Sequence, residues 1–336
     1  MLNRSTAVPD RDGVSPQACF PQSWGGLVGR RRFRAMNTDV EIVAVDWRQS
    51  ALLVSAAQIF VDIEARFSRF RADSELSLLN ARAGEAVAVS PQLLQIIERA
   101  IYFNRLTGGV FDPAILPDLE AAGYDRSFEL VSPTAATRAA RPAVRHASIA
   151  DVRIDRQRRT LTAPGDVRID LGGIGKGHAV DAAAHALTPA RDFMINAGGD
   201  IFASGNASGG AGWPVAVSDP ADEQRDLDVV ILRDEAVATS TIARRRWQRG
   251  NAWHTHIIDP RTRLSVDNDV VSVSVIAPTA TEADVFAKTA LLMGAGGGSR
   301  FLEKRNTSGL FVLSDGAVHR TAGWPGTGGG ISQTRE

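Results

Sequence analysis

Apolar residues recur along this chain with two periods, one typical of helices and one typical of strands. Residues 51–68 follow the helical period, and their apolar side chains form one broad stripe. A second helix is predicted between Ser90, a favoured N-cap followed by proline, and Gly108, which closes it. Residues 279–293 predict a third helix, which the following glycine should stop.

Short β-branched runs bounded by turn residues make the rest of the chain rich in predicted strands. These runs lie at 40–45, 152–155, 160–162, 167–170, 193–195, 213–218, 229–232 and 270–276. Asp315-Gly316 predicts the turn of a later hairpin. Because strands and helices do not alternate regularly, the pattern favours an α+β fold, with mixed sheets flanked by helices, over a doubly wound sheet.

The composition is that of a globular protein. Of 336 residues, 44% are hydrophobic and 23% are charged, which suits one large domain or two closely packed ones. Residues 1–30 are rich in Pro, Gly and Ser without periodicity, so we expect a disordered N-terminal arm there. The folded domain should span residues 31–320, and the glycine-rich residues 321–336 should form a flexible tail.

The charge balance argues against a strongly basic or acidic binding surface. The 38 basic and 38 acidic side chains cancel, so nothing favours binding to nucleic acid. The arginine runs at 30–32 and 244–246 are interpreted as solvated faces, although the second lies close to a histidine motif. No apolar run approaches the roughly 20 residues of a membrane span. Cys19 has no partner for an intrachain disulfide and no signal peptide is visible, so we expect a cytoplasmic location.

The most informative stretch is Ile-Asp-Leu-Gly-Gly-Ile-Gly-Lys-Gly at 169–177. Its glycines lie between a predicted strand and a predicted helix start. Backbone N–H groups can approach phosphate oxygens there, and Lys176 can add positive charge. The spacing matches neither a P-loop, because a glycine follows the lysine, nor a G-x-G-x-x-G dinucleotide fingerprint. From the loop alone, a phosphate site and a plain glycine turn both stay open.

Three other segments combine glycine, carboxylate and amide groups. After the first helix, Asp73 or Ser74 can cap a short helix or bind a ligand. After the second helix, Asp112 precedes a proline that holds it extended, so its carboxylate can face a ligand or stabilise the turn. After the strand at 193–195, Asn196 can both donate to and accept from a planar heterocycle.

His254 and His256 form a His-x-His pair shortly before Asp259. On a strand both rings would face the same side, so zinc binding has to be considered, but no third ligand is evident. A proton-transfer imidazole or a core histidine with satisfied hydrogen bonds is the more natural interpretation.

Taken in order, these segments resemble the ApbE family of FAD-dependent flavin transferases. The similarity covers residues 33–318. The matching motifs are Met-Asn-Thr at 36–38, Phe-Ser-Arg-Phe-Arg at 67–71, Gly-Gly-Val-Phe-Asp-Pro at 108–113, the loop at 169–177, Asn-Ala-Gly-Gly-Asp at 196–200, His-Ile-Ile-Asp-Pro at 256–260 and Ala-Asp at 283–284. The resemblance implies an α+β fold that binds FAD in a cleft between two lobes.

The resemblance also implies a chemistry. Many members use Mg²⁺, cleave the FAD pyrophosphate and attach FMN through a phosphoester to a threonine or serine of an acceptor flavoprotein, releasing AMP. Others hydrolyse FAD to FMN and AMP. By this likeness His256 would activate the acceptor hydroxyl, and the Gly173 carbonyl and Asp284 would hold the metal. The residues lining the FAD site would be Met36, Phe70, Val110, Phe111, Asp112, Asp170, Lys176 and Ile257.

One position departs from the family pattern Ala-Asp-x-x-x-Thr, in which Asp and Thr lie one helical turn apart and both ligate magnesium. Lys288 stands at the threonine position, and Thr289 lies one residue, about 100°, further around the helix. A lysine that faces the site would repel magnesium and could itself neutralise the pyrophosphate. If the lysine snorkels away, Asp284, backbone and water would hold the metal.

Two smaller departures concern the acceptor side. Thr241 and Arg263 stand where the family usually has glycine, and the tyrosine that usually follows the first of these glycines is missing.

Three hypotheses follow. The leading one is an FAD:protein FMN transferase, and the second is an FAD pyrophosphatase. The third is an FAD-binding protein that has lost its metal chemistry, which Lys288 motivates.

Overall fold

The computed structural model describes residues 28–46, 48, 50–126, 147–207, 210–222, 224–249 and 252–326. Cys19 and all but the last three residues of the expected N-terminal arm lie outside the described residues. In the part of the chain that the structure describes, every helix falls short of the length or hydropathy that a bilayer span requires. The cytoplasmic location stays a prediction.

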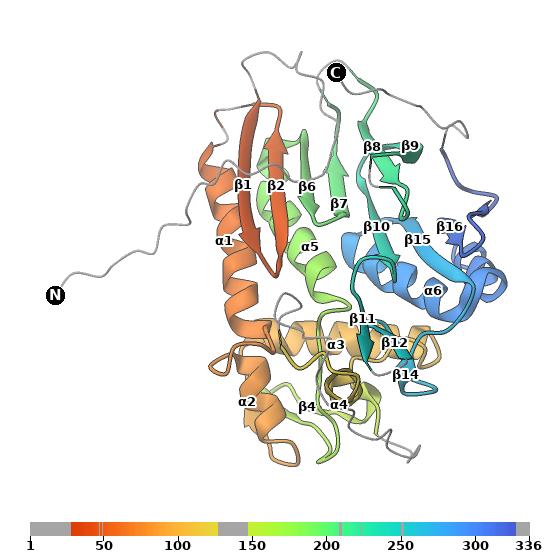
Figure 1. Ribbon diagram of the computed structural model, residues 1–336. Coiled ribbons are helices and arrows are strands. Elements are labelled where there is room, and N and C mark those ends of the chain that lie inside the picture. Colours follow the sequence, from red (N-terminus) through yellow and green to blue (C-terminus); the bar gives the residue numbers. More distant parts are fainter. Residues whose placement is uncertain are drawn as a thin grey trace.

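An eight-stranded sheet forms the frame of the molecule (Figure 1). In spatial order its strands are β1 (Gly29–Ala35), β2 (Thr38–Ala44), β6 (Phe193–Ala197), β7 (Asp200–Ser204), β10 (Glu235–Thr241), β15 (Val270–Ala277), β16 (Ser308–Leu313) and β17 (Val318–Arg320). All neighbouring strands in it run antiparallel. The helices are inserted between groups of strands instead of alternating with single ones, so the predicted α+β fold is confirmed.

Three long helices cover one face of this sheet. They are α1 (Ser50–Phe67), α5 (Gly175–Leu187) and α6 (Ala280–Glu303). The buried residues of α1, such as Phe60, belong to the apolar stripe that the sequence predicts. α6 is interrupted at Gly294, where a φ of 72° breaks the helical path at the predicted stop.

The opposite face of the sheet is covered by the hairpin of β8 (Trp213–Ser218) and β9 (Asp226–Leu232). This face has its own apolar cluster, which includes Trp324. The Trp324 indole N–H donates to the Asp228 carboxylate at 3.1 Å. Residues 321–326, which the sequence assigned to the flexible tail, therefore pack with the domain, whereas 327–336 lie outside the described residues.

Smaller elements, together with the 16-residue helix α3 (Pro91–Leu106), form a second group, most of it below the sheet in Figure 1. The smaller elements are α2 (Glu75–Ala81), β3 (Val87–Ala88), α4 (Leu116–Ala121), η3 (Ile149–Asp151), β4 (Arg153–Asp155), β5 (Thr160–Thr162), η4 (Thr188–Ala190), β11 (Arg246–Arg249), β12 (Ala252–Thr255), β13 (Ile258–Asp259) and β14 (Leu264–Ser265). Ser90 caps α3 as predicted, because its hydroxyl oxygen accepts a hydrogen bond from the Leu93 N–H at 3.1 Å.

The predicted strand at 167–170 is not formed. The Asn80 side chain donates to the Ile169 carbonyl at 2.8 Å and accepts from the Ile169 N–H at 2.7 Å. The Asp170 N–H donates to the Pro113 carbonyl at 2.9 Å. A side-chain amide can satisfy a backbone donor and acceptor in place of a neighbouring strand. The hydrophobic pattern of the segment does not distinguish these two kinds of partner, so it predicted a strand.

Gly177 allows α5 to approach the start of α6. A Cβ at this position would lie 2.5 Å from the Ala280 carbonyl oxygen and 2.8 Å from Thr281 Cα, both backbone atoms.

In an open helix, Gly→Ala stabilises by up to about 1 kcal/mol. Here we expect Gly177→Ala to lower the free energy of unfolding by about 1–3 kcal/mol, because the helices must separate. Urea titration would measure it. Gly165→Ala, with open space around its Cβ, is the matched control, and equal stability of the two variants would contradict the close approach.

Candidate functional site

A cavity of about 840 Å³ lies between the sheet with its long helices and the smaller elements. Its lining comes from the turn after β1, from β10, α5 and α6 on one side, and from loops of the smaller elements on the other. All the site residues nominated from the sequence line it: Met36, Phe70, Val110, Phe111, Asp112, Asp170, Gly173, Lys176, His256, Ile257, Asp284 and Lys288. Their individual roles stay predictions.

Met36 reaches the cavity from a tight hairpin turn. Met36 and Asn37 join β1 to β2 with φ of 53° and 56°, the left-handed values of a two-residue type I′ turn. For a side chain as large as methionine this backbone conformation is uncommon and costs strain. A Cβ at Gly175 would stand 3.4 Å from the Met36 methyl carbon. The turn therefore places the thioether against the start of α5.

Asp170 is engaged by its neighbours within the cavity wall. Its Oδ2 lies 2.5 Å from Arg69 Nε, and its Oδ1 accepts the Gly172 N–H at 2.8 Å. The Arg69 guanidinium lies 4.1 Å from the ring centroid of Phe70 and 4.7 Å from that of Tyr124. Asp170 thus fixes a cation against two aromatic rings and closes the turn at Gly172. The sequence did not nominate Arg69 or Tyr124, although Arg69 lies inside the Phe-Ser-Arg-Phe-Arg motif.

Asp112 has both carboxylate oxygens in local hydrogen bonds. Oδ1 accepts from the N–H groups of Ala114 and Ile149 at 2.9 and 3.1 Å. Oδ2 accepts from the Ser148 hydroxyl at 2.6 Å. Of the two alternatives that the sequence left open, the structure favours the turn-stabilising one, since these bonds tie the 112–114 turn to η3.

Asp200, which the sequence did not nominate, adjoins the cavity through its contact with Lys176. Gly198 and Gly199, with φ of 63° and 96°, form the two-residue turn between β6 and β7. Asn196 accepts the Gly199 N–H at 2.9 Å, so part of its hydrogen-bonding capacity holds this turn. The turn delivers Asp200, only 1% exposed, to the ammonium of Lys176, with which it forms an ion pair. Asp200 is the last residue of the Asn-Ala-Gly-Gly-Asp motif, and its place in that motif could have identified it from the sequence.

Lys176, Asp200, Asp284 and Lys288 form a largely buried charge cluster beside the cavity. Lys288 Nζ lies 3.4 Å from Asp284 Oδ1. Burial and the neighbouring Asp284 raise the pKa of Asp200 to about 7, while Lys176 and Lys288 oppose the shift. Burial lowers the pKa of Lys176, but the attraction of Asp200 and Asp284 outweighs it and the net pKa is raised. Lys176 therefore stays charged at neutral pH.

Lys288 faces the cavity and Thr289 faces away from it. Thr289 is fully buried and donates its hydroxyl to the Val285 carbonyl at 2.8 Å. Residues 288 and 289 therefore face different sides of α6, as the helical period predicts. A Cβ at Gly173 would lie 2.9 Å from Lys288 Nζ, so the ammonium rests against the glycine-rich loop. The alternative that Lys288 snorkels away is therefore wrong.

His256 follows β12 and presents an imidazole to the cavity. Its Nδ1 is buried, and no described residue makes a hydrogen bond with it. Burial, followed by the positive charges of Arg245 and Lys288, lowers the pKa of His256 to about 3, against an opposing contribution from the Arg245 backbone. The ring is therefore neutral at pH 7 and can accept a proton.

His254 does not join His256 in the cavity. Its ring stacks on Trp247, with centroids 6.2 Å apart and an interplanar angle of 21°. Within the described ranges, no group of three or more His, Cys, Asp or Glu could hold a metal ion. The zinc alternative therefore finds no support, and the two histidines have separate surroundings because the strand ends between them.

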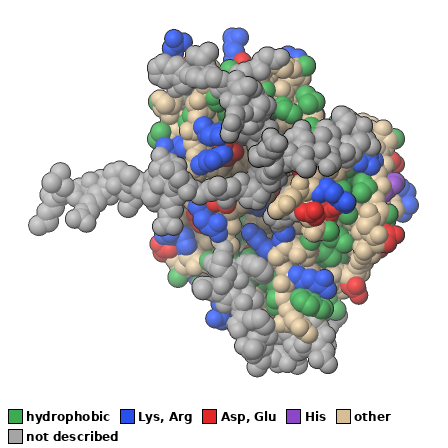
Figure 2. Space-filling model, turned by 45° about the horizontal axis from the view of Figure 1, so that its top comes forward, with side chains coloured by type: hydrophobic (Ala, Val, Ile, Leu, Met, Phe, Trp, Pro, Cys, Tyr) green, Lys and Arg blue, Asp and Glu red, His purple; other side chains and the backbone are tan. Residues whose placement is uncertain are grey.

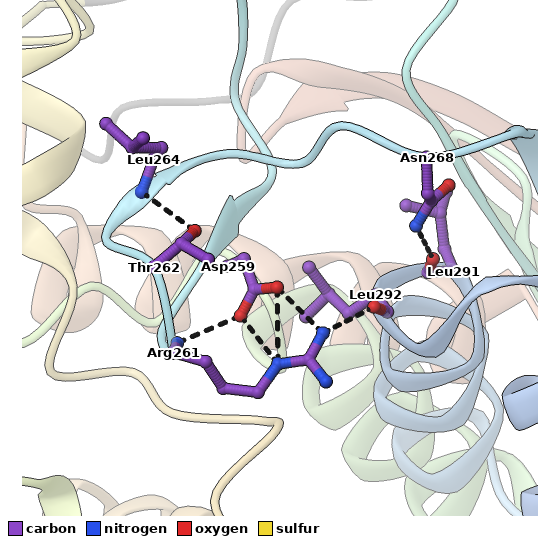
Figure 3. Close-up of polar contacts among 7 residues, drawn as sticks. All are labelled: Asp259, Arg261, Thr262, Leu264, Asn268, Leu291 and Leu292. Atoms are coloured by element: carbon purple, nitrogen blue, oxygen red, sulfur yellow. Dashed lines mark hydrogen bonds and ion pairs between the residues drawn. The ribbon is translucent and has the colours of Figure 1, made fainter.

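The loop after His256 is fastened to the helix that carries Asp284 and Lys288 (Figure 3). Arg261 forms a bidentate pair with Asp259, at 2.7 Å for the shortest contact, and donates to the Leu292 carbonyl at 2.8 Å. Asn268 donates to the Leu291 carbonyl at 2.8 Å. A helix leaves the carbonyls of its last turn without intrahelical donors, and α6 breaks just beyond, at Gly294. The two side chains thus cap the broken helix and connect opposite walls of the cavity.

The second arginine run is not simply a solvated face. Arg244 and Arg245 line the cavity, which corrects the interpretation made from the sequence. On the surface visible in Figure 2, basic side chains lie in separate groups among neutral and apolar ones, consistent with the balanced net charge. Three consecutive arginines in a sequence do not indicate which side chains face a cavity. The turn between β10 and β11 determines this in the structure.

Arg263 takes a conformation that favours glycine. Its φ is 65°, in the left-handed region, which gives a physical reason for the glycine usual at this position. Its Nε lies 3.0 Å from Asp118 Oδ2, an ion pair that a glycine could not make. Arginine at this position therefore fits the left-handed backbone less well than glycine, but it links the 259–264 turn to α4.

His178 gives a pH dependence to stability. Burial, followed by the charge of Arg99, lowers the pKa of His178 from 6.5 to about 4. The unfolded state therefore binds more protons between these values, and the free energy of unfolding falls as pH drops below 6.5, by up to about 1.4 kcal/mol per pH unit. Urea titrations from pH 7 to 4 should show a flatter curve for His178→Gln. The exposed His185→Gln is the control, and an unchanged curve for His178→Gln would refute the assignment.

Comparisons with known proteins agree with this architecture. The family model described as "ApbE family" matches residues 36–311. An FAD:protein FMN transferase of Treponema pallidum is 34% identical over 280 residues, covering 77% of this chain and 76% of that protein. One of Vibrio cholerae is 30% identical over 261 residues, covering 76% and 77%.

Solved structures match as well. The ApbE protein of Thermotoga maritima has a TM-score of 0.78 and 28% identity, and covers 88% of this chain and 97% of its own. The flavin transferase ApbE of Vibrio cholerae has a TM-score of 0.72 and 26% identity, with the same coverage. With the family model matching most of the chain, this protein belongs to the ApbE family.

Proposed function

We propose that this chain is an FAD:protein FMN transferase. The acceptor is a threonine or serine hydroxyl of a flavoprotein. The hydroxyl oxygen attacks the FMN phosphorus, and the bond from that phosphorus to the bridging oxygen breaks. AMP leaves with the bridging oxygen, and the hydroxyl proton passes to a base. The products are a phosphoester-linked FMN and free AMP, so the atoms balance without a redox partner.

One observation carries the proposal: the imidazole of His256 and the glycine-rich start of α5 line the same cavity. A phosphoryl transfer to a hydroxyl needs a base for the proton and fixed positive charge for the phosphates. The name FAD:protein FMN transferase, borne by relatives at 30% and 34% identity, supports the same reaction.

His256 is suited to act as the base. It is neutral in the cavity, and burial together with Arg245 and Lys288 keeps its pKa low. A bound pyrophosphate carries negative charge that offsets these cations, so the pKa of His256 should rise when FAD binds. A higher pKa makes a stronger base, and the hydroxyl proton is then transferred only when the anionic substrate is in place.

The FAD phosphates would bind at the start of α5. The N-terminus of this 13-residue helix carries partial positive charge, and Lys176 in its first turn adds a full one. Arg244 and Arg245 line the cavity as further cations. Phe70, 40% exposed and in edge contact with Tyr124 at 5.9 Å between centroids, offers an apolar surface to a planar ring of the substrate.

The donor set that would hold Mg²⁺ in this family does not fit a metal in this chain. Magnesium prefers oxygen ligands in a near-octahedral arrangement. Lys288 replaces the threonine oxygen, and its ammonium lies between Asp284 and Gly173, the two remaining partners. An ammonium offers only donors, and it repels a divalent cation. We therefore assign no step of the transfer to magnesium.

The transfer itself is tested with FAD and a threonine-containing flavoprotein that a related ApbE enzyme modifies. We expect flavin fluorescence on the acceptor band of a denaturing gel and one AMP released per flavin attached. The acceptor with Thr→Val at the modified position is the control and should stay dark. Release of FMN and AMP without labelling would indicate the pyrophosphatase instead. Bound FAD with neither product would indicate the non-catalytic alternative.

A further inference from the structure

Lysine is rare in this chain and is concentrated in the cavity. Of the 38 basic residues only three are lysines, at 176, 288 and 304. Lys176 and Lys288 both line the cavity, whereas Lys304 is exposed at the end of α6. Because arginine serves nearly everywhere else, two ammonium groups on one cavity call for an explanation specific to that cavity.

The surroundings of Lys288 hold its ammonium in one place. The side chain is 17% exposed, and Nζ lies 3.4 Å from Asp284 Oδ1, one helical turn back along α6. On the other side it contacts Gly173, where a Cβ would come within 2.9 Å of Nζ. A side chain at residue 173 would displace the ammonium from this point, so the glycine and the lysine fit each other.

The charge of the cluster depends on Lys288. When both carboxylates are ionised, Lys176 and Lys288 together balance Asp200 and Asp284, so the four side chains sum to zero. With threonine at 288 the same cluster would hold one ammonium against two carboxylates. That excess of negative charge would repel a pyrophosphate unless a divalent cation were added.

We propose that Lys288 is a built-in cation that takes the place of the divalent metal at the pyrophosphate of FAD, so that this chain binds FAD without magnesium. The inference rests on the proposed function in one respect, that the ligand is FAD. When FAD binds, the ammonium shares its three donors between Asp284 and a phosphate oxygen. A metal is then neither needed nor accommodated, because its position between the loop and Asp284 is taken.

The test measures the Kd of FAD, by quenching of flavin fluorescence, in excess EDTA and in excess MgCl₂. For the native protein the two values should agree within about twofold, and for Lys288→Thr the Kd in EDTA should rise at least about tenfold. Magnesium should restore most of that loss in Lys288→Thr, because the threonine oxygen completes the ligand set. In Lys288→Met, which keeps the length but offers no ligand, magnesium should restore nothing. Lys304→Thr is the matched control and should bind as the native protein does.

A second readout needs no flavin. Mn²⁺ added to the protein alone can be followed by the loss of its free electron paramagnetic resonance signal. We expect binding to Lys288→Thr and none to the native protein or to Lys288→Met. Thermal unfolding of each variant, in EDTA, checks that a lost affinity does not reflect a lost fold.

The outcomes separate the inference from the proposed function. If native FAD affinity rises tenfold or more with magnesium, or if Lys288→Thr binds FAD in EDTA as tightly as the native protein, Lys288 is not the substitute cation, while the transfer reaction can still stand. If the native protein binds no FAD in either condition, the proposed function fails and the inference fails with it. Metal-independent binding without flavin transfer keeps the inference and removes the transferase.

Discussion

His256→Gln should reduce the rate of FMN transfer by about 10²–10⁴-fold, the usual contribution of a positioned general base, while leaving FAD bound. Glutamine keeps a polar side chain of similar reach but cannot take a proton at neutral pH. Single-turnover formation of labelled acceptor measures the chemical step, and flavin fluorescence measures the Kd. The Kd should change little, since the imidazole is proposed to act on the acceptor and not on FAD.

The pH profile distinguishes a base from a packing residue. In the native FAD complex, transfer should fall on the acid side as His256 becomes protonated, and this acid limb should be missing from the residual rate of His256→Gln. His254→Gln, two residues earlier and stacked on Trp247, is the matched control and should retain the native rate and profile. Full activity of His256→Gln, or an unchanged acid limb, would remove His256 from the chemistry.

Lys176→Met should impair both stability and FAD binding. Asp200 is 1% exposed and would lose its ion-pair partner. Removing one partner of a buried pair costs about 3–5 kcal/mol when the remaining charge stays buried. Since the pKa of Asp200 is already raised to about 7, protonation of Asp200 should bring the loss below that range at neutral pH. The same change removes a cation from the start of α5, so we expect the Kd of FAD to rise at least about tenfold. Urea unfolding and flavin fluorescence measure the two effects separately.

The double variant Lys176→Met with Asp200→Asn divides these effects. Neutralising Asp200 removes the unpaired charge, so much of the lost stability should return. FAD affinity should not return, since the cation is still missing. Asp200→Asn alone shows what the amide costs by itself. If affinity recovers together with stability, Lys176 acts only by neutralising Asp200 and has no direct part in binding the phosphates.

Several elements follow from local patterns in the sequence. The 3.6-residue stripe of α1, the Ser90 cap of α3 and the glycine break in α6 are all formed as predicted. Each depends on interactions within a few residues, such as a hydroxyl that accepts from the first turn of its helix or a glycine that leaves the helical region.

Other features depend on partners far along the chain. The segment at 167–170 reads as a strand, but Asn80, about ninety residues earlier, takes up its backbone hydrogen bonds. The resemblance placed Asp170 at the FAD site, but it did not indicate that Arg69, about a hundred residues earlier, pairs with it. Trp324 reads as part of a loose tail, but Asp228 and the second apolar cluster hold it. No local pattern contains these partners, so the sequence alone could not assign them.

The sequence by itself determined the family, the α+β class and many of the residues that meet at the cavity, because ordered motifs carry that information without coordinates. It also determined that Lys288 and not Thr289 lies on the helix face of Asp284, because the helical period puts Thr289 on another face. Only the tertiary structure decided where the Lys288 ammonium lies. A lysine side chain can reach in several directions, and Gly173 on one side with Asp284 on the other selects the direction that fills the expected metal position.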